Sequence, residues 1–226
     1  MHQDESEPLA NAMLAAPLLP SELAEAVKKG VCVPDQAFDR FLPERLQLIS
    51  ARYWTPIRVA MCAAEWLDDL EIRSVVDVGS GPGKFCLVAA LASRCAFLGI
   101  EQRHDLVAVA RKLAKLYHLQ HRVSFIEDTF GDAPPPHAEA YYFYNPFLES
   151  MLDEEGWLDE TVEHSEARHA RDLLAVEHWL GQAPLGTYVL TYNGVGSDLP
   201  PCYDELRADS SFPCPLRLWR RTSRRW

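Results

Sequence analysis

The sequence predicts a three-layer α/β protein with a mostly parallel sheet of six to seven strands, preceded by a set of N-terminal helices. Three observations lead to this fold class. Short apolar runs alternate with segments of helical periodicity, as in proteins built from strand–helix–strand units. The runs are apolar almost throughout, which is typical of strands buried on both faces. The 226 residues are enough for one domain with a short appendage.

The first part of the chain shows helical patterning only. Apolar residues at helical spacing predict helices over residues 21–29, over 35–50 with an interruption at Pro43, and over 56–70. Thr55 is expected to cap the third helix, with Pro56 as its first residue, where the missing N–H of proline does no harm. We divide the chain into a helical N-terminal extension or lid, residues 1–55, and a main domain, residues 56–226.

The main domain alternates strands and helices. Strands are expected over residues 74–78, 96–101, 122–127, 140–145, 187–192 and 216–221. Helices are expected over residues 83–93, 103–118 and 161–180. The last strand, LRLWRR, alternates between apolar and charged residues, so we expect it at the edge of the sheet.

Composition narrows the classes of function. The 22 Lys and Arg residues against 33 Asp and Glu residues give a net charge of −11, whereas proteins that bind nucleic acid usually carry a basic surplus. No apolar run reaches the roughly 18 residues that a membrane helix needs, and the first residues are acidic where a secretory signal would be basic. The six cysteines form no CxxC pair and the eight histidines have no ligand spacing, so no metal site is expected. We expect a soluble, cytoplasmic protein that acts on a small-molecule or protein substrate.

The strongest chemical signal is a glycine-rich loop that follows the first strand and opens a helix. It begins at Asp77 and reads Asp-Val-Gly-Ser-Gly-Pro-Gly-Lys. Ligands of open α/β sheets bind at this end of the strands, and glycine lets the backbone turn sharply and approach a ligand. A dinucleotide loop would read GxGxxG, but the position of its third glycine is Lys84 here. A phosphate loop would end in GK[ST], but Phe85 follows the lysine. Neither phosphate pattern fits.

Acidic residues close the neighbouring strands. Glu101 ends the second strand, where a carboxylate can accept hydrogen bonds from a ribose diol. Glu127 and Asp128 end the third strand, where a side-chain oxygen can accept from an adenine amino group. Asp77 can accept from a ligand ammonium, directly or through water. Together these acids predict a pocket for an adenosine that carries a cationic amino-acid tail.

The segments VVDVGSGPG, GIE and IED resemble the first three motifs of class I S-adenosylmethionine-dependent methyltransferases. The resemblance implies a Rossmann-like fold, S-adenosyl-L-methionine as the cofactor and residues 56–226 as the methyltransferase domain. The cofactor-binding residues that it implies are Asp77, Gly79, Ser80, Gly81, Gly83, Glu101, Gln102, Asp128, Thr129 and Asn145. The layout is also similar to that of the non-SET histone-lysine methyltransferases. The acidic chain lacks their basic extension, so we take that similarity as one of cofactor-site layout.

The end of the fourth strand, Tyr144-Asn145-Pro146-Phe147, is similar to the [DN]PP[YF] motif of methyltransferases that modify planar or amide nitrogens, with one proline missing. In that family the Asn oxygen and a proline carbonyl accept hydrogen bonds from the target nitrogen. Asn145, Tyr144 and Glu149 are therefore the candidate catalytic residues. Pro146 and Phe147 are placed beside the substrate.

The segment before the first motif often covers the cofactor in this superfamily. Tyr53 and Trp54 are accordingly candidate lid residues, and helix packing is the alternative explanation for both aromatic rings.

The expected reaction is in-line transfer of the sulfonium methyl group to a nitrogen or oxygen nucleophile. Three alternatives stay open at this point. An aminopropyltransferase has the same fold and uses a decarboxylated cofactor. A nicotinamide oxidoreductase is disfavoured by the GxGxG spacing. A cofactor-binding module without turnover stays open because fold alone does not determine function. The complete set of acids argues against decay of the site.

Overall fold

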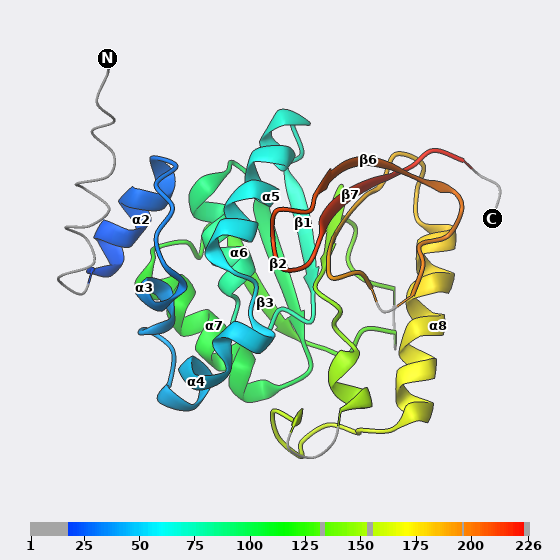
Figure 1. Ribbon diagram of the computed structural model, residues 1–226, viewed down its shortest axis with the longest axis horizontal. Coiled ribbons are helices and arrows are strands. Elements are labelled where there is room, and N and C mark those ends of the chain that lie inside the picture. The colour runs from blue at the N-terminus through cyan, green and yellow to red at the C-terminus, as the bar shows by residue number, and fades with distance from the viewer. Residues whose placement is uncertain (1–17, 132–133, 153–155, 196, 224–226) are drawn as a thin grey trace.

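The computed structural model of the chain describes residues 18–131, 134–152, 156–195 and 197–223. Its centre is a seven-stranded sheet in the order β3-β2-β1-β4-β5-β7-β6 (Figure 1). The strands are β1 Ser74–Val78, β2 Ala96–Glu101, β3 Val123–Glu127, β4 Ala140–Phe143, β5 Tyr188–Tyr192, β6 Tyr203–Asp209 and β7 Leu216–Arg221. The first five pair in parallel, and β7 pairs antiparallel with both β5 and β6. The predicted α/β fold with a mostly parallel sheet is confirmed.

Helices cover both faces of the sheet. They are α2 Pro20–Lys28, α3 Asp35–Asp39, α4 Glu44–Tyr53, α5 Ile57–Asp69, α6 Lys84–Ala92, α7 His104–Leu116 and α8 Glu166–Gln182, with a 3₁₀ turn η1 at Leu148–Met151. Residues of α5, α6 and α7 share one hydrophobic core with α2 and α3, whereas α8 packs into a separate core on the other face. Figure 1 shows α2 to α4 outside the first layer and α8 alone along the opposite side.

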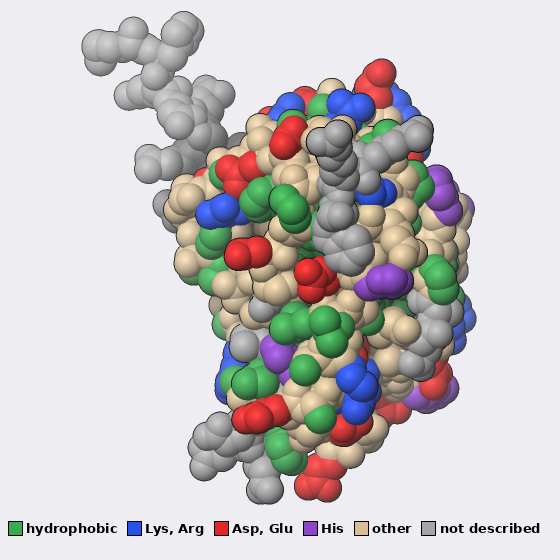
Figure 2. Space-filling model, turned by 90° about the vertical axis from the view of Figure 1, so that its right-hand side faces the viewer, with side chains coloured by type: hydrophobic (Ala, Val, Ile, Leu, Met, Phe, Trp, Pro, Cys, Tyr) green, Lys and Arg blue, Asp and Glu red, His purple; other side chains and the backbone are tan. Residues whose placement is uncertain are grey.

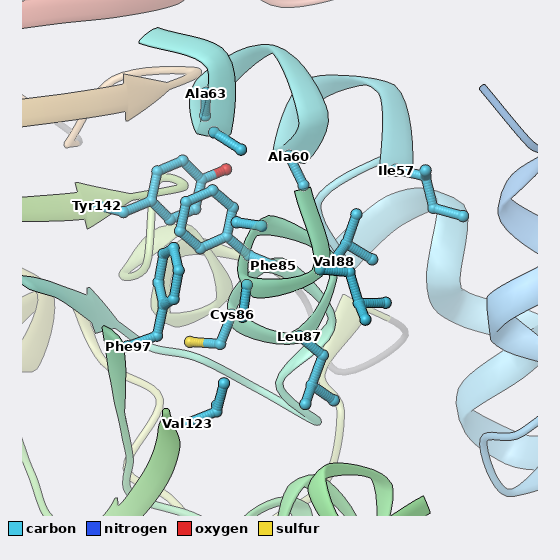
Figure 3. Close-up of a cluster of buried hydrophobic side chains, with 14 of the residues drawn as sticks. Ile57, Ala60, Ala63, Phe85, Cys86, Leu87, Val88, Phe97, Val123 and Tyr142 are labelled. Carbon is cyan, nitrogen blue, oxygen red and sulfur yellow. The ribbon is translucent and has the colours of Figure 1, made fainter. Parts of the chain in front are cut away.

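The larger core forms around α6, which is apolar on all sides and buried along nearly its whole length. Phe85 stacks on Tyr142 of β4 with ring centroids 3.6 Å apart, and meets Phe97 of β2 edge-on at 5.9 Å. Figure 3 shows these rings gathered beside Cys86, beneath α5. Because α6 starts at the glycine-rich loop, this packing fixes the loop on the sheet.

Three predicted details of the secondary structure are wrong. The strand 216–221 is not at the edge, because β6, which the sequence analysis missed, pairs with its outer side. Thr55 does not cap α5: the N-cap is Pro56, and the Thr55 hydroxyl lies 2.8 Å from the Tyr142 hydroxyl. The long helix α8 begins at Glu166 rather than at residue 161, because the side chain of Ser165 caps it.

Charged side chains are interspersed on the face that carries α8. Among the described residues in this view, acidic, basic and histidine side chains alternate with hydrophobic ones rather than gathering by sign (Figure 2). No helix within the described ranges is long and apolar enough to cross a membrane. The N-terminal extension is described from residue 18 onward, so residues 1–17 of the predicted lid lie outside the described part, and the division at residue 55 stays a prediction.

Candidate functional site

A cavity of about 190 Å³ opens at the carboxyl ends of the parallel strands. It lies between β1 and β4, where the strand order reverses: β2 and β3 follow on one side of β1, and β4 and β5 on the other. Ligands bind at this position in open α/β sheets. Its lining includes twelve of the predicted site residues: Tyr53, Trp54, Gly79, Glu101, Gln102, Asp128, Thr129, Tyr144, Asn145, Pro146, Phe147 and Glu149. The structure therefore brings residues from five separate segments together around one cavity.

A smaller cavity of about 30 Å³ adjoins the first. Asp77 and Ser80 line it, and Tyr53, Trp54, Gly79 and Tyr144 line both cavities. Of the predicted cofactor-binding residues, only Gly81 and Gly83 line neither of them.

Glu101 holds the glycine-rich loop in place. Its side chain is buried, and its Oε2 accepts a hydrogen bond from the Gly81 N–H at 3.0 Å. Its Oε1 accepts from the Arg103 N–H at 2.9 Å. Burial raises the pKa of this carboxyl, while the two N–H donors and the Arg103 guanidinium act in the opposite direction. Each oxygen keeps a further lone pair, so an oriented carboxylate remains able to accept from a diol.

The two later glycines of the loop serve close packing. Gly81 has φ +54°, and a Cβ there would lie 2.6 Å from the Trp54 ring. Gly83 has φ +81°, and a Cβ there would lie 2.5 Å from the Phe125 ring. Any other residue would be strained at both positions. Gly83 thus allows α6 to start against β3, and its predicted contact with the cofactor has no support in the cavity lining.

Asp77 lies beneath the loop at the wall of the smaller cavity. Its side chain is buried, and the carboxylate accepts a hydrogen bond from the Cys86 thiol, with Oδ2 and Sγ 3.3 Å apart. Burial raises the pKa of Asp77 to about 7; the thiol donor lowers it and the nearby Glu101 raises it further. A cationic group in the smaller cavity would favour the charged carboxylate.

Asn145 occupies an unusual backbone conformation just after β4. Its φ is +35°, and its N–H donates to the Gly194 carbonyl at 3.1 Å. Its Oδ1 is buried and finds no hydrogen-bond partner among the described residues. The neighbouring Tyr144 packs on Tyr192 with ring centroids 4.8 Å apart, and burial raises its pKa to about 12. Asn145 therefore offers a free acceptor at the end of the strand.

Glu149 is engaged by other protein groups. Arg103 Nη2 donates to both of its oxygens, at 2.8 and 2.9 Å, and the Leu158 N–H donates to Oε1 at 2.6 Å. The Arg103 Nε donates to Asp159 at 3.1 Å. Glu149 thus links the segment after β4 to the end of β2. Because both of its oxygens already accept hydrogen bonds from protein groups, it is poorly suited to act as a base. The buried Arg103 was missed by the sequence analysis, because nothing in the pattern GIEQRHD distinguishes it from an exposed helix-start residue.

The N-terminal helices cover the loop as a lid would. The Trp54 ring lies on Gly81, and its indole N–H donates to the Leu46 carbonyl at 3.2 Å. Tyr53 donates through its hydroxyl to the Gly156 carbonyl.

Lys84 joins these helices to the loop. Its ammonium is buried and lies 2.7 Å from Asp35 and 2.8 Å from Asp39, both on α3. In the sequence Lys84 serves only to exclude a dinucleotide loop. The ion cluster could not be predicted, because the partners of Lys84 are separated from it by more than forty residues of chain.

No protein-family model matches the sequence, and no curated protein sequence is significantly similar to it. Solved structures do share its fold. A protein from Klebsiella pneumoniae assigned provisionally as an O-methyltransferase is 11% identical with a TM-score of 0.54, and the match covers 96% of both chains. The mitomycin 7-O-methyltransferase MmcR is 13% identical with a TM-score of 0.53, over 96% of this chain and 67% of the other. TrmN from Thermus thermophilus is 15% identical with a TM-score of 0.55, over 83% of this chain and 53% of the other. The chain thus has the class I S-adenosylmethionine-dependent methyltransferase fold.

Proposed function

We propose that the protein is an S-adenosylmethionine-dependent methyltransferase that acts on a nitrogen or oxygen atom of a small molecule or a protein side chain. One observation carries the proposal: the buried Glu101 carboxylate is bonded to the Gly81 N–H and lines a cavity at the reversal of strand order. The fold shared with methyltransferases supports it.

The residues present fit an adenosine with an amino-acid tail. Glu101 and Asp128 supply acceptors in the larger cavity, and Asp77 supplies one for an ammonium in the smaller cavity. Ser80 Oγ is buried without a partner among the described residues, as is expected of a polar atom that serves a ligand. When bound, the cofactor would supply a methyl group on a positively charged sulfur, which is already an activated leaving group.

The protein has to hold and align the reactants. Asn145 Oδ1 can accept a hydrogen bond from the N–H or O–H of the methyl acceptor, which orients the nucleophile. Alignment of the reacting atoms contributes at best about 7–11 kcal/mol to rate enhancement. The rings of Tyr53, Trp54 and Tyr144 line both cavities. A bound cofactor and acceptor packed against these rings would leave little room for water at the reacting atoms.

Calorimetric titration with S-adenosylmethionine, S-adenosylhomocysteine and NAD tests the proposal. We expect the two sulfur nucleosides to bind and NAD not to bind; tight binding of NAD alone would contradict it. Glu101→Ala is expected to weaken cofactor binding about tenfold or more, because a charge-assisted acceptor is lost.

A matched control for this variant is Glu127→Ala. Glu127 is the register partner of Glu101 on β3, but it is exposed, pairs with His104 and does not line either cavity. Its loss should leave cofactor affinity unchanged. Equal effects of the two variants would mean that Glu101 acts on the fold rather than on the ligand.

A further inference from the structure

His164 lies in the wall of the larger cavity, just before α8, and no step of the proposed reaction uses it. Its imidazole is only 4% exposed. It stacks on Trp157 with ring centroids 4.3 Å apart and planes 10° from parallel. The ring is therefore fixed in one orientation beside the cavity.

The hydrogen bonds of this ring determine which nitrogen carries the proton. Nε2 lies 2.9 Å from the backbone carbonyl of Asp159, and a carbonyl can only accept, so Nε2 is the donor. In the neutral ring Nδ1 then has a free lone pair. Nδ1 is buried and has no hydrogen-bond partner among the described residues. A buried acceptor without a partner costs free energy, and a ligand that donates to it would remove this cost.

Two sets of contacts connect the segment around His164 with the end of β2. Its Nε2 lies 3.9 Å from Glu149 Oε1, and Glu149 binds the Arg103 side chain. Four residues further along the chain, Arg168 contacts the side chain of Gln102 at 3.4 Å. Both sets of contacts involve residues that directly follow Glu101, namely Gln102 and Arg103. Glu101 is the acid expected to hold the ribose.

We propose that His164 is a ligand-binding residue, whose Nδ1 accepts a hydrogen bond from an N–H or O–H group of the nucleoside bound in the larger cavity. This inference rests on the proposed function, and adds a contact from the segment between β4 and α8 to those from β1, β2 and β3. The donor is the exocyclic amine of the purine or a hydroxyl of the ribose.

Two variants separate the two nitrogens of the ring. Gln at position 164 places an amide near the position of Nε2, keeps a donor for the Asp159 carbonyl and removes the acceptor at Nδ1. Asn places its amide near Nδ1, keeps an acceptor there and loses the bond to Asp159. We expect His164→Gln to bind S-adenosylhomocysteine about tenfold more weakly than the natural protein, and His164→Asn to stay within about threefold of it. His121→Gln, at an exposed position, is the control and should change nothing.

A purely structural histidine gives a different result. His164→Asn would then lower the midpoint of thermal unfolding, and His164→Gln would bind S-adenosylhomocysteine like the natural protein. Unchanged affinity in His164→Gln, or equal loss in both variants, overturns the proposal. If the natural protein itself fails to bind S-adenosylhomocysteine, the proposed function fails and this inference with it. If the natural protein binds and Glu101→Ala weakens the binding while His164→Gln does not, only this inference fails.

Titration with nucleosides identifies the donor. Adenosine, purine riboside and 2′,3′-dideoxyadenosine are compared in the natural protein and in His164→Gln. If the amine donates, the loss of affinity in the variant disappears for purine riboside; if a hydroxyl donates, it disappears for the dideoxy compound. A loss of the same size with all three nucleosides would overturn the assignment of Nδ1 as the acceptor.

Discussion

The enclosed Asp77 should make the stability of this protein depend on pH in a way that one substitution removes. The pKa of Asp77 is raised from 3.8 to about 7 because the carboxylate is buried. Between pH 3.8 and about pH 7, the Asp77 carboxyl is therefore protonated in the folded chain and ionised in the unfolded chain. The contribution of protonated Asp77 to the free energy of unfolding is fully present below pH 3.8 and is lost as the pH rises through about 7.

The size of the effect follows from the same two values. Each pKa unit corresponds to 1.36 kcal/mol, so the ionised Asp77 lowers the free energy of unfolding by about 4 kcal/mol above pH 7. In Asp77→Asn the side-chain oxygen can still accept from the Cys86 thiol, but no charge forms. At pH 8 the variant should be more stable by up to about 4 kcal/mol, or roughly 8–16 °C in Tm for a chain of this size. At pH 4 the difference should vanish.

Urea unfolding between pH 4 and pH 8.5 measures this difference, with the exposed Asp105→Asn as the control. The same substitution should weaken cofactor binding, because the acceptor for the ammonium loses its charge. In the natural protein the affinity for S-adenosylhomocysteine should rise as the pH rises through about 7, and in Asp77→Asn it should not. A variant that is no more stable than the natural protein at pH 8, or a stability difference that is the same at every pH, would show that ionisation of Asp77 does not destabilise the folded chain.

Two further predictions concern the substrate side and the lid. Asn145→Ala should reduce turnover of labelled S-adenosylmethionine at least tenfold while leaving cofactor affinity within about twofold of the natural protein. The reason is that the unpaired Oδ1 of Asn145 is expected to bind the methyl acceptor. Equal losses of turnover and cofactor affinity would mean that Asn145 binds the cofactor instead. Lys84→Met should cost about 3–5 kcal/mol in urea unfolding, because it leaves the largely buried Asp39 carboxylate without its cation. Adding Asp39→Asn should restore part of this loss, whereas Lys112→Met on the exposed side of α7 should cost little. A loss below about 1 kcal/mol for Lys84→Met would contradict the role of the ion cluster.

The parallel core of the sheet is predictable because its strands are apolar on both faces. β1, β2, β4 and β5 are buried at most positions, so each reads as a short hydrophobic run. β6 reads as Tyr-Asp-Glu-Leu-Arg-Ala-Asp and exposes most of its residues at the sheet edge. A charged edge strand has no hydrophobic pattern of its own, so β6 could not be predicted from the sequence. Without β6, the strand β7 was predicted at the edge of the sheet.

That acids and glycines lie near one another can be predicted from the order of residues alone, because the carboxyl ends of neighbouring parallel strands lie at one edge of a sheet. Glu101, Asp128 and the loop after Asp77 follow from that rule alone. Which side chains pair in and around the site depends on the packing of the folded chain. Arg103 forms an ion pair with Glu149, and Lys84 forms one with Asp39. The Thr55 hydroxyl lies within hydrogen-bond distance of the Tyr142 hydroxyl instead of capping a helix. These partners lie between 45 and 87 residues apart in the chain. Such choices depend on how whole elements pack, and no local periodicity encodes the distance between two distant side chains.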